Sequence, residues 1–169
     1  MKSLFKSIGL YDEFIFETEM TKNQFVMNLK KFIYESDFSI FEIADYSIPS
    51  RFEYRGIVNE NDFIIRRKKH FFDNNIQNPT IKGVLDEKDG KTWIKMELSP
   101  SNHSFFKILF LLTFLCILFL NFNFKNNSDV TFILISIFMV IIQYFILKRN
   151  IKKSKYDFKR ELTFIVQKK

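Results

Sequence analysis

Residues 130–147 read VTFILISIFMVIIQYFIL, a run that contains no charged side chain. A second run, residues 105–122, reads FFKILFLLTFLCILFLNF and carries one charge, Lys107, near its start. As a helix, each run of 18 residues would extend about 27 Å, close to the roughly 30 Å of a hydrocarbon core. The rest of this 169-residue chain is too small to bury two helices that are apolar on all sides. The sequence therefore predicts two transmembrane helices.

A short polar link, residues 123–129, separates the two runs, so we expect an antiparallel hairpin over residues 105–148. The tail that follows, residues 149–169, is strongly basic, whereas the link holds one lysine and one aspartate. Cytoplasmic flanks of transmembrane helices carry an excess of Lys and Arg. The sequence thus predicts a multi-pass protein of the cell inner (plasma) membrane, with the N- and C-termini in the cytoplasm.

Residues 1–100 are predicted to form a cytoplasmic α+β domain. Residues 14–18 are typical of a strand. Thr21 and Gln24 match a capping box, in which each side chain binds a free backbone N–H of the other. Apolar residues then recur at helical spacing, which predicts an amphipathic helix over residues 22–35.

The remainder of this domain has the pattern of a β-rich region. The predicted strands are residues 38–43, a hairpin of 51–58 and 62–70 around a loop at 59–61, and a hairpin of 81–85 and 92–98 around Asp89-Gly90. The expected fold class is α+β, a small and mainly antiparallel β-sheet domain with one or two packed helices. A C-terminal two-helix transmembrane hairpin completes it.

The basic tail is expected to contain one further helix, over Ser154–Val166. Phe158, Leu162 and Ile165 fall on one face of that helix. Three interpretations are open. The helix packs on the sheet, or it lies on the membrane with its lysines against anionic lipid, or it is a solvated tail.

Residues 54–100 read YRGIVNENDFIIRRKKHFFDNNIQNPTIKGVLDEKDGKTWIKMELSP. The stretch combines an aromatic-x-Gly element, a Phe-Ile-Ile-Arg strand, a Lys-Gly strand and a closing Ile-x-Met-x-Leu-x-Pro before the membrane. This pattern resembles a group of uncharacterised bacterial membrane proteins with a β-rich cytoplasmic region followed by two helices. The matching positions are Gly56, Pro79, Gly83 and Pro100. The resemblance implies a membrane location and carries no activity.

Residues suited to catalysis or metal binding are scarce. The chain has two histidines, His70 and His103, and one cysteine, Cys116, which lies in the first apolar run. No zinc-ligand spacing and no nucleophile motif results, so we expect neither a metal nor a cofactor. The net charge of +7 is that of Lys148–Lys169 alone, because the rest of the chain is neutral. We therefore expect no nucleic-acid partner.

Two basic segments are the candidate contacts for lipid headgroups or for a protein partner. Their residues are Arg66, Arg67, Lys68 and Lys69 in the domain, and Lys148, Arg149, Lys152 and Lys153 after the second apolar run. The spacing from Arg66 to His70 also resembles the Arg–His signature of helical ribonucleases. That signature needs a helix, whereas the apolar residues before Arg66 predict a strand.

Three function hypotheses follow. The first is a non-enzymatic, membrane-anchored interaction or scaffolding protein that binds the bilayer and a protein partner or a second copy of itself. The second is a membrane-perturbing effector, in which the cytoplasmic domain senses a signal and the hairpins assemble. The third, a membrane-bound enzyme, is disfavoured because the expected site geometry is missing.

Overall fold

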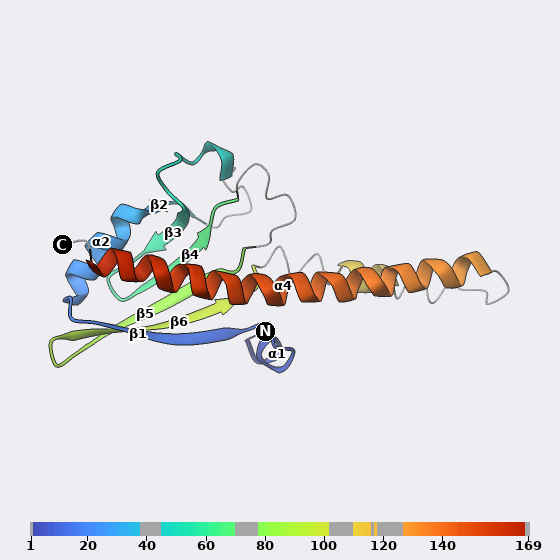
Figure 1. Ribbon diagram of the computed structural model, residues 1–169, viewed down its shortest axis with the longest axis horizontal. Coiled ribbons are helices and arrows are strands. Elements are labelled where there is room, and N and C mark those ends of the chain that lie inside the picture. Colours follow the sequence, from blue (N-terminus) through green and yellow to red (C-terminus); the bar gives the residue numbers. More distant parts are fainter. Residues whose placement is uncertain are drawn as a thin grey trace.

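The N-terminal region forms one mixed six-stranded β-sheet (Figure 1). The computed structural model describes residues 2–37, 45–69, 78–101, 110–115, 117 and 127–167. The strands are β1 Asp12–Thr18, β2 Ile33–Glu35, β3 Tyr54–Val58, β4 Asp62–Arg67, β5 Thr80–Lys88 and β6 Lys91–Ser99. Their order is β1-β6-β5-β4-β3-β2, and every described pair is antiparallel except β2 with β3.

The helices are α1 Lys2–Ser7, α2 Lys22–Phe32, the 3₁₀ helix η1 Asp45–Ser47 and α4 Asn127–Gln167. Residues 110–115 and 117 are also helical. The α+β class is therefore confirmed. The predicted two-helix hairpin is not shown, since α4 is the one helix in the described part of the chain that is long and apolar enough to cross a membrane. Most of the first predicted span and the link lie outside the described residues.

Both predicted hairpins are present. The turn between β5 and β6 has positive φ at both central residues, 54° at Asp89 and 74° at Gly90. This is the primed turn geometry whose twist matches that of the flanking strands. In the other hairpin, β3 begins at Tyr54 and β4 ends at Arg67, so both strands are shorter than predicted.

The predicted helix after β1 begins as expected and ends early. Thr21 and Gln24 form both hydrogen bonds of the capping box. The prediction that the helix extends to Glu35 was wrong, because α2 stops at Phe32 and the next three residues pair with β3 as strand β2. The predicted strand 38–43 lies outside the described residues.

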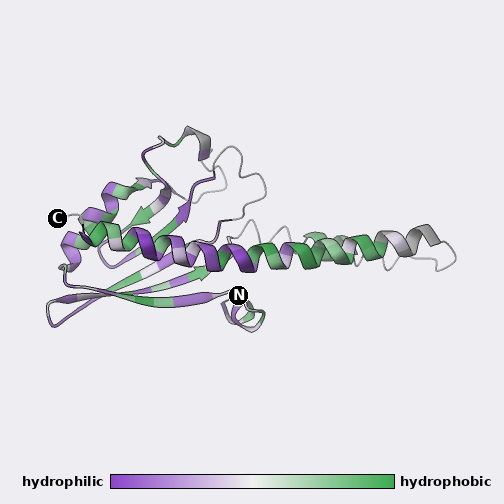
Figure 2. Cartoon of the chain, viewed as in Figure 1, coloured by the Kyte–Doolittle hydropathy of each residue, from purple (hydrophilic) through white to green (hydrophobic). Residues whose placement is uncertain are grey.

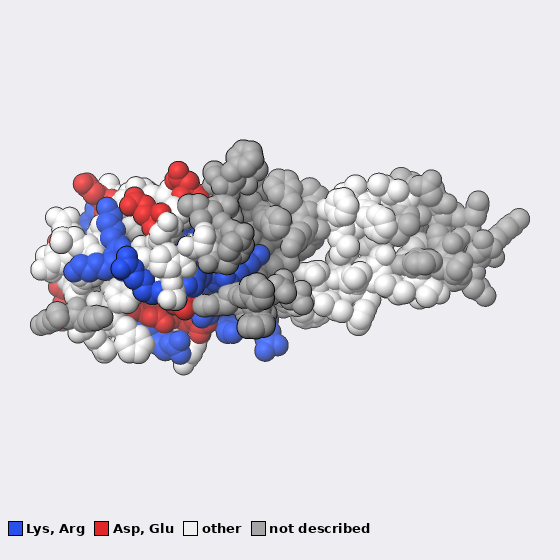
Figure 3. Space-filling model, turned by 90° about the horizontal axis from the view of Figure 1, so that it is seen from above, with Lys and Arg blue, Asp and Glu red and all other residues white. Residues whose placement is uncertain are grey.

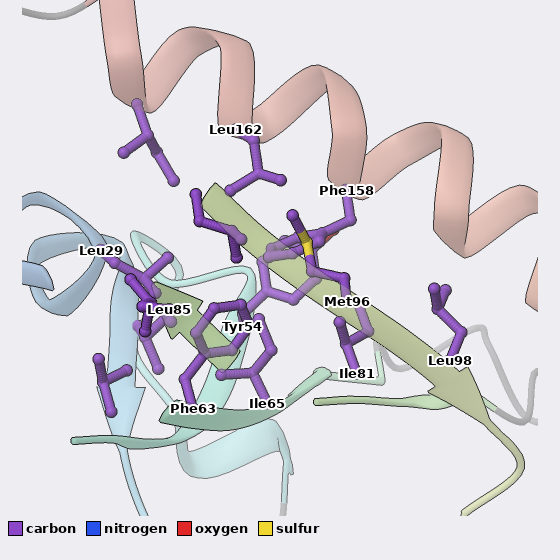
Figure 4. Packing of buried hydrophobic residues seen from close by; sticks show 14 of the residues in the cluster. Leu29, Tyr54, Phe63, Ile65, Ile81, Leu85, Met96, Leu98, Phe158 and Leu162 are labelled. Carbon is purple, nitrogen blue, oxygen red and sulfur yellow. The ribbon is translucent and has the colours of Figure 1, made fainter. Parts of the chain in front are cut away.

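One face of the sheet is covered by α2 and by the C-terminal half of α4. The hydrophobic core lies between this face of the sheet and the two helices (Figure 4). Phe158 of α4 lies at its centre, with its ring centroid 5.3 Å from that of Tyr54 and 6.2 Å from that of Phe63. Burial raises the pKa of Tyr54. Gly83 makes room for Phe63, since a Cβ added there would lie 2.1 Å from the tip of that ring.

Helix α4 is about 60 Å long and has two unlike halves. Its N-terminal half extends beyond the sheet and is largely hydrophobic (Figure 2). Large apolar side chains such as Leu134 and Phe138 are exposed there. Its C-terminal half lies along the sheet and buries Ile151, Phe158 and Leu162. Of the three interpretations of the tail, packing on the sheet is the one observed. The helix does not start at Ser154, because it continues unbroken from the second apolar run.

We predict that Phe158→Ala lowers the free energy of unfolding of the domain by about 3–5 kcal/mol, because it removes a ring from the centre of the core. Phe164→Ala, in the same helix, is the matched control. Phe164 is 54% exposed whereas Phe158 is 1% exposed, so its loss should change stability by less than about 0.5 kcal/mol. Thermal unfolding of the full chain in detergent measures both. Equal losses for the two variants would contradict the observed docking of α4.

Candidate membrane-facing site

The side-chain environment of α4 changes abruptly where the helix leaves the sheet. Leu147 is 1% exposed, whereas Phe145 is 61% exposed. At this level the hydroxyl of Tyr144 donates a hydrogen bond of 2.9 Å to the backbone oxygen of Ile8. Lys148 Nζ lies over the Tyr144 ring, 5.7 Å from its centroid. These contacts mark the end of the domain from which the apolar half of α4 extends.

Helix α1 closes this same end of the domain (Figure 1). Phe5 and Leu10 anchor the helix and the residues after it in the core. Lys2 contacts the carboxylate of Glu97 on β6. The hydrogen bond from Lys2 is the main cause of a lowered pKa at Glu97. Residue Gly9 then lies against the side chains of α4, near Lys148.

The four predicted basic residues of α4 follow the apolar half of the helix and lie on one side of it, away from the buried Leu147 and Ile151. We call Lys148, Arg149, Lys152 and Lys153 the basic collar. Lys148 is partly buried, and the other three side chains are exposed. On the face seen in Figure 3, the described charged side chains lie on the domain, and the described atoms of the extension are uncharged. Lys155, two residues after Lys153, joins α4 to β1 through an ion pair of 2.7 Å with Asp12.

In the other predicted basic segment, residues 66–69, the side chains point in different directions because strand residues alternate between the two faces of the sheet. Arg66 lies on the sheet face opposite α4, whereas Arg67 points towards α4 and forms ion pairs with Asp157 at 3.2 Å and with Glu53 at 3.4 Å. Lys68 is buried, and its Nζ donates to the backbone oxygen of Pro49. The backbone N–H of Lys69 donates to Asp45. These four residues therefore do not form one continuous exposed patch.

A buried ion pair was missed by the sequence analysis. Arg55 on β3 is 1% exposed, and its Nε lies 3.0 Å from Oδ1 of Asp45 in η1. Residues 45–53 cover this part of the outer sheet face, and Ile48 among them is buried. An arginine at an alternating strand position is ordinarily exposed, so no signal in the sequence distinguished Arg55.

A groove of about 1260 Å³ lies at the opposite end of the domain, between α2, the end of β1 and the last turn of α4. Its charged residues include Glu17, Lys31, Arg51 and Lys91. Glu17 and Lys91 form an ion pair of 2.8 Å, and this hydrogen bond raises the pKa of Lys91. In the part of the chain that the structure describes, no three His, Cys, Asp or Glu side chains are placed to hold a metal ion.

We predict that Glu97→Gln loosens α1, because it removes the charged partner of Lys2. Hydrogen exchange of residues 2–9 in the full chain should accelerate at neutral pH. In the natural chain the pKa of Glu97 lies below its ordinary value of 4.5, so this contact stabilises the folded state at neutral pH and is lost as the pH falls through that lowered pKa. Acidification should therefore loosen α1 in the natural chain and have little further effect in the variant.

Glu87→Gln, an exposed change at the far end of β5, is the control and should leave exchange of residues 2–9 unaltered. The same exchange rates in Glu97→Gln and in the natural chain would refute a holding role for the contact between Lys2 and Glu97.

Comparison with known proteins does not assign the chain to a family. No protein-family model matches the chain, and no curated protein matches it.

Proposed function

We propose that the chain is an integral membrane protein whose cytoplasmic α+β domain is held at the inner membrane by a two-helix hairpin, and that it acts as a non-enzymatic interaction or scaffolding protein. The observation that carries this proposal is the continuity of α4. One helix exposes its apolar half and buries its other half in the core of the domain. An apolar surface of that extent in water would drive aggregation, whereas a bilayer buries it.

The continuity of α4 also supports a rigid connection between the domain and the apolar half of the helix. No flexible linker separates the apolar half of α4 from Leu147 and Ile151, which are core residues. The domain is thus held directly against the membrane surface. The basic collar at this junction favours the cytoplasmic side. A second span is supported by the apolar sequence of residues 105–122 and by the exposure of Phe110 and Ile117 in its helical parts.

The exposed part of the outer sheet face, on β1, β6 and β5, supports the interaction role. Ile15, Val84 and Trp93 are exposed on three neighbouring strands, on the face opposite α2 and α4. Lys95 lies between Ile15 and Val84 in the register, and charged residues surround the three apolar side chains. Exposed aromatic side chains such as Trp93 are enriched at protein-binding surfaces. We call Ile15, Val84 and Trp93 the outer-face cluster.

We predict the topology from single cysteines in a Cys116→Ser background, labelled with a membrane-impermeant maleimide. Ser50→Cys and Gln167→Cys, both at exposed positions, should react only after cell lysis. Asn126→Cys, in the predicted link, should react in intact cells. Labelling of Ser50→Cys in intact cells would place the domain outside the cytoplasm. Protection of Asn126→Cys until lysis would refute the hairpin.

We further predict that photo-cross-linking amino acids at Trp93 and Val84 capture a protein in native membranes, because the outer-face cluster is the proposed contact. The same probe at Phe164 is the matched control, since this exposed aromatic residue lies on α4. An adduct of twice the chain mass identifies a second copy, and another mass identifies a different partner. Equal capture at all three positions, or none at any, would contradict a partner on this face.

A further inference from the structure

We infer that helix α1 and the turn that follows it form a second bilayer contact, in which Leu4 of the helix and Ile8 of the turn lie at the level of the headgroups of anionic lipids beside the basic collar. This inference rests on the proposed insertion of α4. The contact is distinct from the transmembrane segments, because α1 belongs to the opposite end of the chain and joins the domain through its own core residues Phe5 and Leu10.

The depth of α1 is fixed by its bonds to α4. The hydrogen bond from Tyr144 to the backbone of Ile8 places Ile8 at the turn of α4 where apolar exposure ends. Lys148 lies against the adjoining Gly9. A tyrosine and a lysine at such a boundary are the side chains that prefer the interface between hydrocarbon and water. If the exposed half of α4 is in the bilayer, α1 is therefore at its surface.

The chemistry of α1 suits that position. Leu4 is 50% exposed and Ile8 is 41% exposed, and their spacing of four residues places them on one side. Lys2 and Lys6 are two residues from Leu4 and lie on the other side of the helix, and they are more than half exposed. A short apolar face opposite a face with lysines is the pattern of a segment that lies in the membrane interface.

The local charge favours an anionic surface. Two carboxylates face α1, Glu97 in contact with Lys2 and Glu13 at 3.6 Å from Lys6. They offset the lysines of α1, so the positive surplus comes from the exposed Arg149, Lys152 and Lys153 of the basic collar. Each basic side chain close to an anionic membrane contributes roughly 1 kcal/mol of attraction.

A lipid surface explains these observations better than a protein partner at α1. The residue after α1, Ile8, is bound to Tyr144, which is next to the exposed Phe145 of the apolar half of α4. The exposed charged side chains of the basic collar are all positive. Contact at α1 would also stop the domain from rotating about the axis of α4. The orientation of the outer-face cluster relative to the membrane would then be fixed.

The test is nitroxide quenching of a fluorophore on single cysteines, with the full chain in a Cys116→Ser background. The protein is reconstituted into vesicles of phosphatidylcholine alone or mixed with phosphatidylglycerol. Each preparation contains a lipid that carries a nitroxide either near the headgroup or near the end of an acyl chain, because Phe138 lies about 14 Å along α4 from Leu147. Leu4→Cys and Ile8→Cys report on α1. Phe138→Cys in the apolar half of α4 reports on insertion, and Val84→Cys is an aliphatic control of similar exposure on the sheet.

We expect strong quenching by the headgroup nitroxide at positions 4 and 8, strong quenching by the acyl-chain nitroxide at position 138, and little quenching by either at position 84. Phosphatidylglycerol should increase quenching at position 4. That increase should be lost in Lys152→Gln/Lys153→Gln and kept in the control pair Lys30→Gln/Lys31→Gln, which changes exposed lysines of α2. No quenching at position 138 would refute the proposed membrane insertion itself. Quenching at 138 with none at 4 and 8 would overturn the role of α1 and leave the insertion intact, and a blue-shifted but unquenched label at 4 would assign α1 to a protein contact.

Discussion

Phe158 lies at the centre of the contact between α4 and the sheet. Both the stability of the domain and the position of the apolar half of α4 depend on that contact. The ring packs against Tyr54 and Phe63 and is wholly enclosed. Arg67 and Lys155 add ion pairs from α4 to β4 and β1 at either side. Because α4 covers the core and also forms the apolar extension, the packing that stabilises the domain also sets its position relative to the proposed bilayer.

The elements that could be predicted from the sequence are those specified by neighbouring residues. The capping box of α2 needs only Thr21 and Gln24, which are one turn apart. The hairpin around Asp89 and Gly90 needs only the turn and the alternation on each side of it. The apolar face of Phe158, Leu162 and Ile165 was also evident, although its partner surface was not.

The features that could not be predicted depend on residues far apart in the chain. The sequence Ile33–Glu35 continues the helical pattern of α2, and it becomes a strand because β3 offers an unpaired edge. Strand alternation turns neighbouring basic residues to opposite faces, so Arg66 and Arg67 serve different surfaces although the sequence groups them. Arg55 is buried because a loop ten residues before it in the chain carries Asp45. The candidate site at α1 likewise depends on contacts between the N-terminal residues and the middle of α4, at Tyr144 and Lys148. No periodicity in residues 1–11 indicated it.

The chain order of the core has a consequence for biogenesis. Strand β6 ends at Ser99, and the chain returns to the core only at Leu147, after both apolar runs. During synthesis the sheet therefore emerges before the helix that covers it, and the apolar runs emerge between the two. Until α4 is made, the sheet lacks Ile151, Phe158 and Leu162 and keeps an open apolar face. In the proposed membrane arrangement, the domain can therefore be completed only after both apolar runs have been synthesised, so the anchor is made before the domain that it holds.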